Sequence, residues 1–106
     1  MAKSIFVNLP ITDLARSTRF YEALGASKNP QFSDARSSCM VLSDTIYVML
    51  LTHERYRNFT SRPIADAHKT SASLIALSAE SKDEVNAVIS RAAASGWTLK
   101  QLAVRK

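Results

Sequence analysis

The N-terminal stretch from Ile5 to Gly25, IFVNLPITDLARSTRFYEALG, is the feature that most constrains the fold, because it encodes a strand, a turn, a helix and a helix stop in direct succession. Its first residues are β-branched or aromatic, and we expect Pro10, which has no amide donor, to end the strand. Thr12 or Asp13 then supplies the side-chain oxygen of a helix start. Apolar residues spaced three and four apart give the helix one buried side, and Gly25 ends it.

The second half of the chain repeats this unit. The run from Ser73 to Ala79, SLIALSA, has the composition of a strand. Ser81 and Glu84 form the S-x-x-E pattern of a capping box, and the apolar spacing that follows predicts a second helix, ended by Gly96. We therefore predict an internal repeat of strand plus helix.

Three short β-rich runs lie between the two units, at 28–32, 37–42 and 46–51. Pro30 marks the first run as an edge or irregular strand, and the turn at Ser43 and Asp44 predicts a hairpin of the other two. The first half is therefore βαβββ. The chain after Gly96 has room for one further strand, at about 98–104.

The first unit resembles the start of the vicinal oxygen chelate superfamily, which includes glyoxalase, extradiol dioxygenases, fosfomycin-resistance enzymes and bleomycin-resistance proteins. The resemblance covers residues 3 to about 99. In the first unit its pattern is a strand followed in order by the sequence letters DL, S, FY and LG. The residues that carry this pattern are Val7, Leu9, Pro10, Asp13, Leu14, Ser17, Phe20, Tyr21, Leu24 and Gly25.

This resemblance implies an α+β fold of paired βαβββ modules within a single glyoxalase-like domain, 1–106. We expect a first module at about 3–52, a connection at 53–72 and a second module at about 73–106 that lacks its last two strands. A truncated or frame-shifted product and a genuinely short variant both remain open. Because missing strands leave unpaired edge groups, we expect a homodimer, with or without exchanged modules.

Composition sets the broad class. The hydrophobic fraction of 46% and the charged fraction of 22% are those of a soluble globular protein. Without a spanning segment or a signal peptide, we predict a cytoplasmic protein that does not contact a membrane.

The net charge of +5 favours anionic partners. We interpret the basic and aromatic residues near 55–69 as a connecting loop and predict no nucleic-acid binding. The single cysteine, Cys39, is expected to be buried and inert.

The resemblance also implies a divalent metal, held by His, Glu or Gln on the first and last strands of each module and acting as a Lewis acid. The matching positions here carry Phe6, then Leu50 in a segment LLTH similar to the glyoxalase pattern ELTH, then Ser73 or Leu74. None of these side chains is a ligand of the expected kind. We therefore expect no metal site and no cofactor.

Both histidines, His53 and His68, fall in the predicted connection. Together with Glu54 and Asp66 they supply the side chains of a two-His carboxylate set. Because no helical spacing fixes their geometry, we interpret the histidines as solvated loop residues.

Asn8, Tyr47 and Met49 are the candidate substrate-binding residues. Asn8 shares the strand face of Phe6, where its amide either projects into a cavity or bonds to nearby backbone. Tyr47 and Met49 alternate with Val48 and its neighbours, and both sets are apolar, so alternation leaves open which set lines a cavity.

For function, the resemblance implies a glyoxalase-like or bleomycin-resistance-like protein that has lost its metal site and whose specific function is open. One alternative is a glyoxalase-like lyase or thiol transferase acting on a glutathione-type or other small anionic substrate. Another is a non-catalytic module that binds a small molecule. Whether the protein is an enzyme stays open at this point, because one scaffold hosts several lyase, dioxygenase and binding functions.

Overall fold

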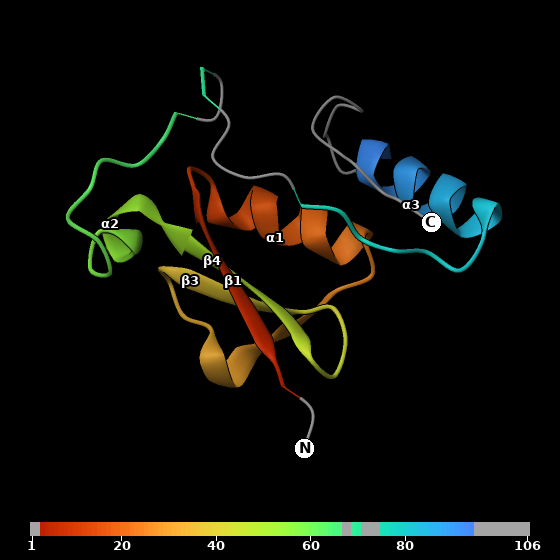
Figure 1. Cartoon of the computed structure of the whole chain (residues 1–106), viewed down its shortest axis with the longest axis horizontal. Coiled ribbons are helices and arrows are strands. Elements are labelled where there is room, and N and C mark those ends of the chain that lie inside the picture. The colour runs from red at the N-terminus through yellow and green to blue at the C-terminus, as the bar shows by residue number, and fades with distance from the viewer. Residues whose placement is uncertain (1–2, 67–68, 71–74, 95–106) are drawn as a thin grey trace.

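The computed structural model describes residues 3–66, 69–70 and 75–94. The elements follow in the order β1 (Ile5–Ile11), α1 (Leu14–Ala23), β2 (Ser27–Asn29), the 3-10 turn η1 (Pro30–Phe32), β3 (Ser37–Val41), β4 (Ile46–Thr52), α2 (His53–Tyr56) and α3 (Lys82–Ala94) (Figure 1). The first half is therefore βαβββ, as predicted, and the whole is an α+β fold.

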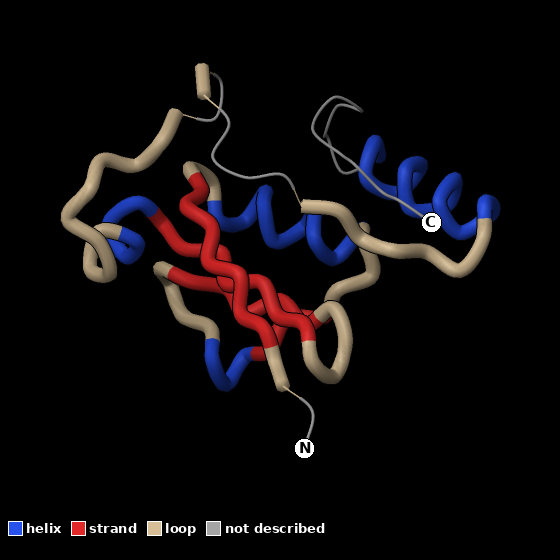
Figure 2. Tube along the Cα trace, in the orientation of Figure 1, coloured by secondary structure: helices blue, strands red, loops and turns tan. Residues whose placement is uncertain are grey.

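The four strands form one sheet in the order β1-β4-β3-β2 (Figure 2). β1 runs parallel to β4, with Val7 opposite Val48, whereas β3 is antiparallel to both of its neighbours. The predicted hairpin is the β3–β4 pair. Its turn is closed by Leu42, whose N–H donates to the carbonyl of Ile46 at 2.9 Å. β1 and β2 are the two edges of the sheet.

The prediction that Pro10 ends the first strand is wrong. β1 continues to Ile11, and Pro10 lies opposite Leu51 of β4. An edge strand tolerates proline, because half of its amides face away from the sheet and need no partner strand. By contrast, Pro30 does end β2, and the run at 28–32 is a three-residue strand followed by η1.

Asp13, rather than Thr12, begins α1. Its side chain accepts a hydrogen bond from the N–H of Arg16 at 3.0 Å, which satisfies one of the free amides of the first turn. The helix ends as its sequence predicts.

Gly25 closes α1 with a φ of 102°, in the left-handed region that favours glycine. Its N–H donates to the carbonyl of Glu22 at 3.0 Å, and the next N–H, of Ala26, donates to Tyr21 at 3.0 Å. These two bonds form a Schellman motif, which reverses the chain and brings Ala26 onto the core.

The hydrophobic core lies between α1 and one face of the sheet. Met40 and Leu50 are fully buried there and Val48 is 2% exposed, with Leu14 and Tyr21 of α1 packed against them. Each large side chain buried in this way contributes roughly 1.5–3 kcal/mol. Burial also raises the pKa of the Tyr21 phenol above its ordinary value.

The second helix, α3, is confirmed and lies beside α1 (Figure 1). Val88 and Ala92 form its buried side. Arg91 donates from Nε to the carbonyl of Ala23 at 2.9 Å, which joins α3 to the last turn of α1. None of the described helices is both long enough and apolar enough to cross a membrane.

The capping box at the start of α3 forms in part. Ser81 accepts from the N–H of Glu84 at 3.1 Å, as predicted. The Glu84 carboxylate, however, accepts from the N–H of Glu80, one residue before the expected donor. The side chain therefore caps the turn that enters the helix and leaves the reciprocal bond unmade.

The strand predicted at 73–79 is not formed over Ile75–Ala79, where Leu77 alone makes a β-bridge. Its first two residues, together with Gly96 and the strand expected at about 98–104, lie outside the described residues.

Candidate functional site

The candidate site is the face of the sheet opposite α1. Strand alternation places Phe6 and Asn8 of β1 on this face, because Val7 and Leu9 pack into the core. The same alternation places Tyr47 and Met49 of β4 on this face. The structure thus decides what the apolar pattern of β4 left open, and Asn8, Tyr47 and Met49 share one surface.

The aromatic part of this face is a stack of Phe6 on Tyr47. The two residues are opposite each other in the parallel register, and their ring centroids are 4.5 Å apart with planes inclined by only 9°. Tyr47 donates from its hydroxyl to the carbonyl of Asp44 at 3.2 Å, and this bond holds the Tyr47 ring in place. Phe6 is 54% exposed, so the Phe6 ring presents an open π surface to solvent.

Asn8 lies beside this stack, in a row with Met49 and Cys39 across three strands. Its Nδ2 donates to the carbonyl of Phe6 at 3.2 Å, so the amide does bond to nearby backbone. The side chain is nevertheless exposed, and it makes no further hydrogen bond to the residues that the structure describes. One N–H and the amide oxygen of Asn8 thus face solvent on this surface.

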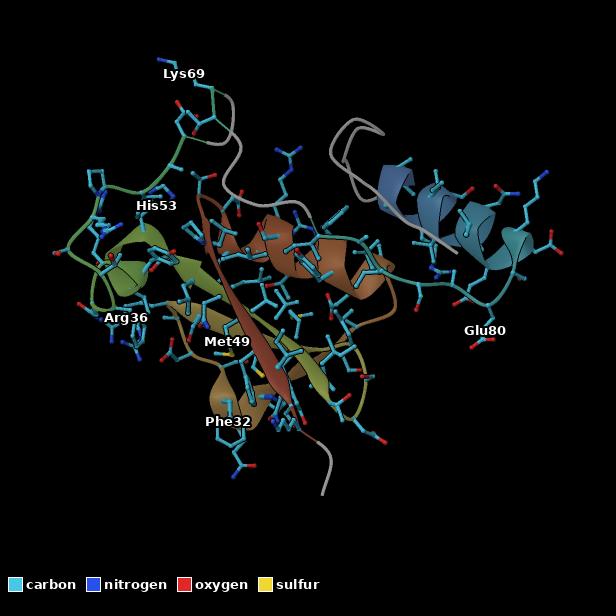
Figure 3. The ribbon with its side chains drawn as sticks, viewed as in Figure 1. Phe32, Arg36, Met49, His53, Lys69 and Glu80 are labelled. Atoms are coloured by element: carbon cyan, nitrogen blue, oxygen red, sulfur yellow. The ribbon has the colours of Figure 1, made fainter. Side chains whose placement is uncertain are left out.

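Cys39 is the β3 member of this row. It is 2% exposed, so its predicted burial is confirmed. Its N–H donates to the hydroxyl of Ser33 at 2.9 Å, so the segment after η1 covers it. Burial raises the pKa of the Cys39 thiol. Phe32 of η1 projects outward beside this row and is 63% exposed (Figure 3). Phe32 was not among the predicted site residues, and its only sequence signal was an aromatic residue close after Pro30.

The side chains of this face do not fit the divalent metal of the resembling superfamily. The described residues contain no group of three or more His, Cys, Asp or Glu placed to hold a metal ion. Phe6 is on the face, but Leu50 is fully buried under α1 on the other side of the sheet. Leu50, which the resemblance matches to a ligand position, therefore does not share a face with Phe6. The residues of β4 that do share the face are Tyr47, Met49 and Leu51, and none of them is a hard-metal ligand.

The alternative two-His carboxylate set is not assembled in the described part of the chain. His53 begins α2, where the Thr52 hydroxyl caps the turn. The carboxylate of Glu54 pairs with Arg36 at 3.3 Å, with both side chains exposed. Figure 3 shows His53 and Arg36 near α2, whereas Met49 lies over the centre of the sheet. His68, like Ser73 and Leu74, lies outside the described residues.

Comparison with solved structures shows that the fold of this chain occurs in other proteins. A hypothetical protein from S. aureus superposes with a TM-score of 0.71 at 24% identity, over 91% of this chain and 72% of the other. A glyoxalase/bleomycin resistance protein/dioxygenase family enzyme from Burkholderia phytofirmans PsJN superposes with a TM-score of 0.66 at 18% identity, over 90% of this chain and 74% of the other. No family model and no curated protein matches the sequence. The chain has the vicinal oxygen chelate fold, the fold of the glyoxalase/bleomycin resistance protein/dioxygenase family.

Proposed function

We propose that this protein is a metal-free binding protein of the vicinal oxygen chelate fold, which takes a small anionic molecule with a flat apolar part on the sheet face opposite α1. One observation carries the proposal: the exposed ring of Phe6, stacked on Tyr47, stands where the resemblance places the first metal ligand. At this position of β1 the chain therefore has an aromatic surface in place of a metal-coordinating side chain.

The chemistry of the face defines the ligand class. The open ring of Phe6 offers stacking to a planar group, and Met49 offers an adaptable apolar contact beside it. The free amide atoms of Asn8 offer one donor and one acceptor. The net charge of +5 biases the surface toward an anion. A small aromatic anion meets these requirements.

The test is calorimetric titration with S-benzylglutathione, an anionic conjugate with a flat apolar group. Phe6→Ala should weaken binding roughly two- to tenfold, the range expected for one lost aromatic stack. Phe59→Ala is the matched control, because Phe59 is 65% exposed beside Arg55 of α2 and belongs to another surface. No binding to the unchanged protein, or an equal loss in both variants, would contradict the proposal.

A metal-dependent lyase or thiol transferase is the second candidate, favoured by the same positive charge, which suits a glutathione-type substrate. Metal analysis separates the two. Protein purified without chelator should hold clearly less than one metal ion per chain, and EDTA should leave the binding of S-benzylglutathione unchanged. A stoichiometric metal, or turnover of the hemithioacetal of glutathione when Zn²⁺ or Ni²⁺ is supplied, would establish the second candidate instead.

We further propose that a second copy of the chain supplies the opposite wall of this site. Two aromatic side chains, Phe6 and Phe32, are more than half exposed on or beside the face, and β1 is an edge strand next to it. A homodimer would remove both rings from water. Light scattering at tens of micromolar should give twice the chain mass, and Phe32→Ser should lower that mass. A stable monomer at that concentration would refute the pairing.

A further inference from the structure

A second surface of the molecule has the features of a binding site. It is an open pocket of about 470 Å³ between the first half of α1 and the β2–β3 side of the sheet. Its apolar wall is made by Leu14 and Ala15 of α1 and by Ala35, which precedes β3. The volume lies within the range of about 300–1,000 Å³ found for small-molecule sites.

The two charged side chains that line this pocket are both positive. Arg19 of α1 and Lys28 of β2 line it, and no aspartate or glutamate does. Neither cation forms an ion pair with any residue that the structure describes. Two cations from separate elements therefore line one opening, with no counter-ion among residues 3–66, 69–70 and 75–94.

The base of the pocket is held by a hydroxyl pair. Thr18 donates from Oγ1 to the carbonyl of Leu14 at 2.7 Å, so its only hydroxyl proton is in use. Ser38 of β3 must then be the donor in the 2.9 Å bond between the Ser38 and Thr18 hydroxyl oxygens. Ser38 is fully buried, and this bond fixes the spacing of α1 above β3. The pocket is thus formed before any ligand arrives.

We propose that this pocket binds a small organic anion, with a phosphate or carboxylate group between Arg19 and Lys28 and an apolar part against Leu14, Ala15 and Ala35. The two cations supply charge attraction and hydrogen-bond donors to the anionic group. The apolar wall gives such a ligand an advantage over a bare inorganic ion. The pocket is independent of the proposed function, because it lies on the α1 side of the sheet, opposite Phe6.

The test is an amide NMR titration of the full chain with phenyl phosphate and, separately, with inorganic phosphate. Shifts should concentrate at residues 14–19, 28 and 35–38, and phenyl phosphate should bind more tightly. An exposed charge contact changes affinity by up to about fivefold. The double variant Arg19→Gln with Lys28→Gln should therefore weaken phenyl phosphate binding by more than about twofold and by up to about 25-fold.

A control must distinguish binding in the pocket from a general effect of positive charge on the affinity for anions. The control Arg57→Gln with Lys69→Gln removes the same two charges near α2 and in the connection, where neither residue lines the pocket. It should keep the affinity within about twofold, as should Phe6→Ala. Absence of localised shifts, an equal loss in both double variants, or equal binding of the two probes would overturn the proposal.

Discussion

The hydrogen bond between Thr18 and Ser38 predicts an asymmetric response to mutation. Thr18→Val preserves the shape of the side chain but removes the acceptor of the Ser38 hydroxyl, which is fully buried. An unsatisfied buried hydroxyl costs about 1–3 kcal/mol. Ser38→Ala removes that hydroxyl and leaves Thr18 bonded to the carbonyl of Leu14, so we expect it to cost less, about 0.5–1 kcal/mol.

The double variant gives the sharper test of this reasoning. When both hydroxyls are removed no buried donor is left unpaired, so Thr18→Val with Ser38→Ala should be no less stable than Thr18→Val alone, and the single effects should not add. Urea unfolding followed by circular dichroism measures all three free energies, with the midpoint of Thr18→Val expected about 1 M lower at an unchanged slope.

The control for this cycle is Thr12→Val, an exposed threonine just before α1. It should change the free energy of unfolding by less than about 0.5 kcal/mol. A Ser38→Ala variant that is less stable than Thr18→Val, or additive single effects, would refute the assignment of Ser38 as the buried donor.

The other predictions concern single sites. Gly25→Ala should destabilise the protein by about 0.5–1.5 kcal/mol in the same urea assay, because a φ of 102° strains alanine while no atom within 4 Å opposes its Cβ; an unchanged or raised stability would contradict the left-handed cap. Cys39 should resist iodoacetamide in the folded protein and react once unfolded, because burial raises its pKa and excludes the reagent; complete labelling of native protein within minutes would refute its burial. Asp34 has a lowered pKa, first because it accepts from the N–H of Arg36. Its contribution to stability should be present above about pH 4, the unfolded value, and be lost as pH falls through the lower folded value. Asp34→Asn should reduce that acid sensitivity. An NMR titration that gives the Asp34 carboxyl the ordinary pKa of aspartate would contradict this prediction.

The features that the sequence predicted well are local. The cap of α1 and the stop at Gly25 each involve partners within a few residues, so residue types located the stop and narrowed the cap to Thr12 or Asp13. Pro10 was misjudged because its effect depends on whether β1 is an edge strand, and the partner of β1 is at the other end of the module. The short pattern around a residue carries no information on that placement.

The residues of the candidate site likewise divide into those that a local rule predicts and those that depend on packing between distant elements. Asn8 was assigned to the face of Phe6 by alternation within one strand, which is a local rule. The face of Leu50 stayed open in the sequence because its neighbours in β4 are apolar on both sides, and only the packing of α1 distinguishes the two faces. The stack of Phe6 on Tyr47 depends on the parallel register, so neither residue alone could predict it.

The parallel pairing of β1 with β4 also sets the order in which the fold can form. Ile5 pairs with Ile46, and α1, β2 and β3 lie between them in the chain, so this contact closes the longest loop of the sheet. The β3–β4 hairpin and α1 need only local contacts and are expected to form earlier. Substitutions in β1 should then accelerate unfolding and leave the folding rate almost unchanged. We therefore expect β1 to join the sheet last, which would complete the surface that carries Phe6 only at that step.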